Sequence, residues 1–216
     1  MAAREYGQYC GVTRALELVG ERWALLIVRD LLVGPRRYGE LAAGLPRIPS
    51  NILAARLKEL QEAGIIRRGP RSRIVVYELT DYGRELEPVV LALGTWGFKA
   101  MGDPRDEQIV TPDSMTMALR TAFRADVAAR LPATDYGARF GGAELRIHVA
   151  GGLLEVTRDA ALAASVDLSF AAGPGIRRLI SGELAPDRAI DTGVIEVLGG
   201  RRELLDRFAS TFHLAA

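Results

Sequence analysis

The segment Ser50–Gly64, SNILAARLKELQEAG, constrains the fold of this chain more than any other. Leu53, Leu57 and Leu60 recur at i, i+4 and i+7, which predicts an amphipathic helix with one buried stripe. Ser50 starts this helix, and small or polar residues face away from the stripe: Asn51, Ala55, Lys58 and Glu62. Such a face suits entry into a duplex major groove, although an ordinary surface helix has the same polarity.

The residues after this helix favour the first interpretation. Gly64 supplies a left-handed helix stop, and two β-branched runs follow, separated by the tip sequence GPRSR. They predict a short antiparallel hairpin that turns at Gly-Pro and carries four arginines near its tip: Arg67, Arg68, Arg71 and Arg73. A helix, a glycine, a basic hairpin and a further helix form the layout of a winged helix.

The charge distribution points to a polyanionic partner. Residues 36–73 carry nine Arg or Lys and three Glu, a net charge of +6, whereas residues 101–216 carry 13 Arg and 16 acidic residues. We expect phosphate or minor-groove contacts from four arginines: Arg36, Arg37, Arg71 and Arg73. For the groove helix we expect contacts from Ser50, Asn51, Arg56 and Lys58, with Arg56 at the edge of the buried stripe.

The remaining helices of this half complete a mostly α domain over residues 1–101. Apolar periodicity predicts helices at 11–19, 22–33 and 37–43, and a Thr80 cap predicts one long helix at 81–101. That last helix is apolar over a wide surface. It either forms a dimer seam, which we favour, or packs onto the first two helices.

After a polar linker at 102–111, residues 112–216 read as an α+β domain. Thr111 and Pro112 open a helix running to about Leu131. Strands are expected at 136–140, 144–150, 153–158, 165–171 and 193–198, with helices at 174–181 and 201–214. The sheet is expected to be antiparallel or mixed.

Aromatic residues concentrate in this second half. We single out six apolar residues there: Phe123, Phe140, Phe170, Leu179, Phe208 and Phe212. They predict either a packed core or an apolar cavity roofed by the closing helix, and the sequence does not separate the two.

Composition excludes several classes of protein. The apolar runs at 24–28 and 89–94 are far too short to span a membrane, and the N-terminus has no apolar leader, so we expect a cytoplasmic protein. The single cysteine excludes an internal disulfide. Neither His148 nor His213 has neighbours that suit a metal site, and no catalytic motif is present, so we expect no cofactor and no enzyme.

Cys10 carries one further hypothesis. Arg14 lies one helical turn away and is expected to lower the pKa of the thiol, which suits a redox sensor. A small buried apolar residue is the commoner role of a lone cysteine.

Residues 9–97 resemble the HxlR family of bacterial winged-helix regulators, which are relatives of the MarR group. The matching residues are Cys10, RALELVGERWALLIVRDLLVGPRRYGEL, LPRIPSNILAARLKELQEAGIIRR, YELTDYGRELEPVV and TWG. Pro49, Ser50 and Asn51 fall where that family starts its recognition helix, and Arg56 matches its usual Arg-Leu pair. The wing is shorter than in many members. The resemblance implies a homodimer that binds a double-stranded DNA operator and controls transcription.

Residues 112–216 resemble the sterol-carrier-protein type of lipid-binding domain. The resemblance rests on VDLSFAAG, RRLISGEL and APDRAIDTGVIEVLGGRRELLDRFASTF. It implies a pocket for an apolar small molecule, which would act as an effector.

Together these features predict a dimeric regulator whose two recognition helices read half-sites about one helical turn apart. An effector in the second domain would change operator affinity by binding one arrangement better than the other. Two alternatives remain: a lipid or small apolar ligand carrier whose helical half only dimerises it, and an enzyme that uses the second domain's cavity.

Overall fold

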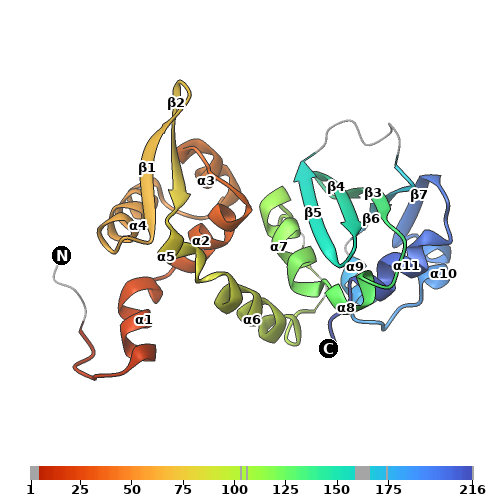
Figure 1. Ribbon diagram of the computed structural model, residues 1–216, viewed down its shortest axis with the longest axis horizontal. Coiled ribbons are helices and arrows are strands. Elements are labelled where there is room, and N and C mark those ends of the chain that lie inside the picture. Colours follow the sequence, from red (N-terminus) through yellow and green to blue (C-terminus); the bar gives the residue numbers. More distant parts are fainter. Residues whose placement is uncertain (1–4, 103, 106, 159–165, 174, 216) are drawn as a thin grey trace. The chain divides into compact units, whose positions relative to one another are not determined.

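The structure, a computed structural model, describes residues 5–102, 104–105, 107–158, 166–173 and 175–215 (Figure 1). Its contacts divide the chain into two units, Met1–Val90 and Leu91–Ala216. This division falls inside a helix, and the domain limits expected from the sequence, 1–101 and 112–216, stay a prediction. No helix in the described ranges is both long and apolar enough to cross a membrane.

Four helices begin the first unit: α1 (Gly11–Val19), α2 (Ala24–Val33), α3 (Tyr38–Gly44) and α4 (Ser50–Glu62). Helix α2 begins two residues later than predicted, because Trp23 lies in the left-handed region with φ of 82°. The Arg22 guanidinium lies 5.2 Å from the centre of the Trp23 ring. A left-handed residue of this type leaves no trace in a hydrophobic pattern.

Helix α4 ends as the sequence predicts, at a glycine. Gly64 has φ of 69°, its amide donates to the Gln61 carbonyl, and the Ile65 amide donates to the Leu60 carbonyl, both at 2.9 Å. These two bonds satisfy carbonyls that the helix end leaves open. Ile65 is buried, and the first strand of the hairpin begins at the next residue, Ile66.

The hairpin consists of β1 (Ile66–Arg71) and β2 (Ile74–Leu79), paired antiparallel (Figure 1). The predicted Gly-Pro turn is wrong, because Gly69 and Pro70 lie within β1, opposite Val76 and Val75. The turn instead lies at Ser72 and Arg73, where Ser72 takes up φ of 57°. In a two-residue hairpin turn, a left-handed residue matches the twist of the strands.

The predicted helix over 81–101 is two helices, α5 (Asp81–Arg84) and α6 (Glu87–Phe98). Thr80 caps α5 as predicted, since its hydroxyl oxygen accepts from the Gly83 amide at 3.1 Å. Pro88 accounts for the break: proline has no amide hydrogen, and its ring clashes with the carbonyl four residues earlier, here that of Arg84.

After α6, the second unit continues with α7 (Pro112–Ala122) and α8 (Ala125–Ala128). Thr111 caps α7 as predicted, but the expected continuous helix to Leu131 is wrong. The chain leaves the helix at Phe123, which forms an isolated bridge with Phe212. This pairing with a distant segment overrides local helix propensity.

A five-stranded mixed sheet follows, as the sequence allows. Its order is β5-β4-β3-β6-β7, and only the β3–β6 pair is parallel. The strands are β3 (Thr134–Phe140), β4 (Ala143–Ala150), β5 (Leu153–Arg158), β6 (Leu168–Ala172) and β7 (Ile195–Gly200). Burial alternates along β4, so one face of the sheet carries the core.

Three more helices complete the unit: α9 (Ile176–Ile180), α10 (Pro186–Asp191) and α11 (Leu204–Thr211). Helix α10 is not predicted from the sequence. Its Asp187 pairs with Arg202, and its Asp191 pairs with Arg188. Ser165 and Pro174, the predicted first residues of a strand and a helix, lie outside the described residues.

Candidate nucleic-acid interface

Helix α4 has the two faces that its sequence predicts. Leu53, Leu57 and Leu60 are at most 2 % exposed. Ser50, Asn51 and Lys58 lie on the exposed side, and the Lys58 ammonium is 3.7 Å from the Glu62 carboxylate. Ala55 is half-buried rather than fully outward, and Ala54 is exposed in its place.

The start of α4 is tied to α3 by a tyrosine. The Tyr38 hydroxyl donates to the Ser50 carbonyl at 2.9 Å. At the start of α3, the Glu40 carboxylate accepts from the Arg37 amide at 2.6 Å, and Arg37 is exposed. Helix α3 therefore fixes the first turn of α4, where Ser50 and Asn51 lie.

The hairpin presents cations at its tip. Arg71 and Arg73 are exposed, and neither forms an ion pair with any residue that the structure describes. Nearer the base, the Arg67 guanidinium lies 2.8 Å from the Glu78 carboxylate across the strand pair. The tip thus holds the cations best available to a phosphate backbone.

Arg36 lies at the root of the hairpin rather than at its tip. Its backbone pairs with that of Tyr77 in β2, and its guanidinium donates to the Pro35 carbonyl at 2.9 Å. Its side chain is half-buried. Arg36 and Arg37 are therefore neighbours in sequence, yet only Arg37 is exposed.

Arg56 does not lie on the exposed face of α4 with Ser50, Asn51 and Lys58. Its side chain is 12 % exposed and lies between two carboxylates, those of Glu21 and Glu59. Sequence reasoning places Arg56 at the edge of the buried stripe, but it gives no sign of the Glu21 partner.

Three further exposed residues belong to this surface, in addition to the contacts expected from the sequence. They are Tyr38, Arg47 and Arg68. Arg47 and Arg68 contribute to the +6 charge count, which was the signal available for them. Tyr38 becomes visible only through its hydrogen bond to the start of α4.

Cys10 is exposed in the single chain rather than buried among apolar residues. It lies at the N-terminus of α1, where hydrogen bonds from the amides of Thr13 and Val12 lower the pKa of the thiol. Arg14, the cause expected from the sequence, instead pairs with Glu17 at 3.1 Å. The lowered pKa is therefore an effect of the helix N-terminus.

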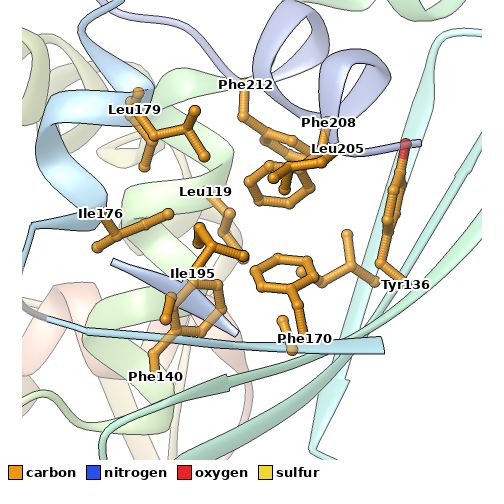
Figure 2. Close-up of a cluster of buried hydrophobic side chains, with 14 of the residues drawn as sticks. Leu119, Tyr136, Phe140, Phe170, Ile176, Leu179, Ile195, Leu205, Phe208 and Phe212 are labelled. Carbon is orange, nitrogen blue, oxygen red and sulfur yellow. The ribbon is translucent and has the colours of Figure 1, made fainter. Parts of the chain in front are cut away.

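The six apolar residues singled out in the second unit belong to one hydrophobic cluster, and Figure 2 shows all of them except Phe123. Five are at most 2 % exposed, and Phe123 packs against them half-buried. The Phe208 ring lies 4.6 Å from that of Phe212 and 5.1 Å from that of Phe170, measured between ring centres. Figure 2 shows Phe140, Phe170, Leu179, Phe208 and Phe212 converging between the sheet and helices α9 and α11.

Comparison with known proteins matches the N-terminal half of the chain. The sequence profile of the family described as HxlR-like helix-turn-helix matches residues 18–104. An uncharacterised HTH-type transcriptional regulator of Mycobacterium tuberculosis is 42 % identical over 112 residues, which are 50 % of this chain and 65 % of that protein. This chain thus spans slightly less than two thirds of that relative.

A second relative is the HTH-type transcriptional regulator YodB of Bacillus subtilis. It is 38 % identical over 85 residues, which cover 38 % of this chain and 76 % of YodB. The crystal structure of quinone-bound YodB covers 41 % of this chain and 96 % of its own, with 35 % identity and a TM-score of 0.37.

Proposed function

This chain belongs to the HxlR-like helix-turn-helix family, and we propose that it is a dimeric, DNA-binding transcriptional regulator. One observation carries the proposal. The first unit combines a helix with a small polar outer face and a hairpin tip whose Arg71 and Arg73 have no ion-pair partner among the described residues. The relatives that match this unit are named as transcriptional regulators.

In the proposed complex, α4 is the recognition helix and lies in the major groove. Ser50 and Asn51 reach base edges from its first turn, and Lys58 reaches a phosphate. Arg71 and Arg73 lie against a neighbouring phosphate strand or in the minor groove, and Arg37 contacts the backbone near the start of α3. Arg36 supports the root of the hairpin. The protein would act in the cytoplasm.

An apolar stripe on α6 supports the dimer. Val89, Leu93 and Trp96 recur at i, i+4 and i+7 and are 48 %, 45 % and 75 % exposed. Exposed aliphatic and aromatic side chains in one helical row are typical of a surface that a partner covers. We propose that this stripe pairs two copies of the chain, so that two recognition helices face DNA.

The second unit is proposed to sense an apolar small molecule, by its resemblance to sterol-carrier domains. Because Phe140, Phe170, Phe208 and Phe212 fill the core, such a molecule would have to displace these side chains to enter. A ligand that opens the core would thus change the second unit's packing. Mass spectrometry of molecules that copurify with the protein tests this part of the proposal.

The regulatory function is tested with duplex DNA from upstream of the chain's own coding region. Binding is measured by fluorescence anisotropy between 50 and 300 mM salt. We expect the logarithm of affinity to fall linearly with the logarithm of salt concentration, with a slope of about −0.9 for each phosphate contacted. The double variant Arg71→Ala/Arg73→Ala should bind weakly, whereas the control Arg188→Ala, in α10, should bind like the parent.

Two results would count against this function. One is the absence of any salt-dependent binding to duplex DNA. The other is equal binding by the parent and the hairpin variant. A protein that bound no DNA but copurified with a lipid would instead favour the carrier alternative.

A further inference from the structure

We propose that Arg56 is a positioning residue for DNA recognition, whose guanidinium fixes α4 on the junction between α1 and α2 without contacting DNA. This inference rests on the proposed function and names a residue on which that function depends. It departs from the expectation that Arg56 reaches into the groove.

The contacts of Arg56 point inward. One terminal nitrogen lies 3.4 Å from the Glu21 carboxylate, and the other pairs with the Glu59 carboxylate one turn further along α4. The Arg56 side chain is 12 % exposed, and its Nε is buried without a hydrogen-bond partner among the described residues. The guanidinium therefore lies in a partly desolvated site beside two carboxylates. Ion pairs in such a site are stronger than ion pairs on the open surface.

Helix geometry separates Arg56 from the reading face. At about 100° per residue, Arg56 lies roughly 140° around the axis from Asn51. A helix that presents Asn51 to base edges therefore turns Arg56 towards the protein. Asn51 and Arg56 therefore cannot both contact bases in the same groove.

The pairing with Glu21 connects two parts of the unit that meet at α4. Glu21 follows Gly20, which ends α1, and precedes Trp23, whose left-handed backbone starts α2. Leu53, Leu57 and Leu60 bury α4, but apolar contacts tolerate small rotations and shifts. The planar guanidinium bonds in fixed directions to carboxylates on either side, so it fixes the rotation of α4.

This role of Arg56 predicts an unusual effect of Glu21→Gln on DNA affinity. Removing a negative charge from a DNA-binding unit ordinarily strengthens binding, because it reduces repulsion of the phosphates. If Glu21 holds Arg56, Glu21→Gln should instead weaken specific binding, as Arg56→Met should. We expect a loss of about five- to tenfold for each, which lies between the small effect of an exposed ion pair and the large effect of a fully buried one.

The test compares parent, Glu21→Gln, Arg56→Met, Arg56→Lys and the double variant on one operator duplex across a range of salt. Arg56→Met should lower affinity with an unchanged salt slope, whereas loss of a phosphate contact lowers the slope by about 0.9 per site. Arg56→Lys should recover part of the loss, because an ammonium reaches one carboxylate well but not two. The double variant should lose no more than either single variant. Arg139→Met, which removes an exposed pair with Glu144 in the second unit, is the matched control.

The inference is overturned if Glu21→Gln binds as well as the parent or better, or if Arg56→Met flattens the salt slope. The second result would make Arg56 a DNA contact. A parent protein that binds no duplex would overturn the proposed function and this inference together. If the parent binds the duplex but Glu21→Gln or Arg56→Met gives one of the two results above, this inference alone is overturned.

Discussion

The backbone of Arg36 pairs with that of Tyr77: the Arg36 amide donates to the Tyr77 carbonyl at 2.9 Å, and the Tyr77 amide donates back at 2.8 Å. The segment that enters α3 therefore lies along β2 as a one-residue third strand. Helix α3 in turn reaches α4, through the bond from Tyr38 to the Ser50 carbonyl. The hairpin and α4 are thus joined through one short segment, which suits a surface proposed to meet DNA at two places.

Asn51→Ala and Arg71→Ala should have different effects on DNA binding. Asn51 is proposed to read a base edge, so its loss should reduce the preference for operator over unrelated duplex, by about 1–3 kcal/mol per site. Arg71 is proposed to contact phosphate, so its loss should weaken binding to every duplex and flatten the salt slope. Anisotropy titrations with operator and shuffled duplexes measure both effects. If both variants match the parent at low and moderate salt, these contacts are wrongly assigned.

Leu93→Glu should dissociate the proposed dimer. Leu93 is 45 % exposed in the middle of the α6 stripe, so a carboxylate there costs the single chain little. In a dimer the same carboxylate would be buried against apolar neighbours, which is strongly unfavourable. Light scattering after size-exclusion chromatography should give the molar mass of one chain for the variant and of two chains for the parent. Leu153→Glu, at a 76 % exposed position in β5, is the control. If the parent protein has the molar mass of a single chain, the proposed dimer is wrong.

How far the sequence determines the fold differs from one element to the next. Helix α4 could be placed from sequence because its leucine repeat and Gly64 are both local signals. The break before α6 has a local cause too, Pro88, but its apolar neighbours on both sides favoured one long helix. The end of α7 has no local signal, since it depends on a bridge between Phe123 and Phe212, 89 residues apart in the chain.

The candidate site shows the same division. Exposure of Asn51 and Lys58 follows from helix periodicity, and the charge of the hairpin tip follows from composition. The inward position of Arg56 depends on Glu21, 35 residues away in the chain, and no periodicity records that partner. Contacts between distant residues thus decide the end of α7 and the position of Arg56, whereas the left-handed Trp23, Pro88, the hairpin turn and the Arg14–Glu17 pair are local features.

The Cys10 thiol should react as a thiolate at lower pH than an ordinary cysteine. Amides of the first turn of α1 lower its pKa, so the midpoint of its alkylation by iodoacetamide should lie below the usual value of about 8.5. Arg14→Ala should leave the midpoint unchanged, because Arg14 is paired with Glu17. Mass spectrometry of alkylation against pH measures both, and a midpoint at or above the usual value would contradict the assignment. If Cys10 senses oxidants, Cys10→Ser should also abolish any oxidant effect on DNA binding.

Phe208→Ala tests whether the second unit has a packed core or a space that a ligand can use. Phe208 is fully buried, and its ring lies 5.4 Å from that of Tyr136, 5.1 Å from that of Phe170 and 4.6 Å from that of Phe212. In a packed core, removing the ring loses its transfer free energy and leaves a cavity, which together cost about 3–5 kcal/mol of unfolding free energy. Urea unfolding followed by circular dichroism measures this loss, with Leu153→Ala as an exposed control that should change stability by less than about 0.5 kcal/mol. A loss below about 1 kcal/mol for Phe208→Ala would mean that its neighbours rearrange freely around it, which is the property that an apolar effector would need to enter.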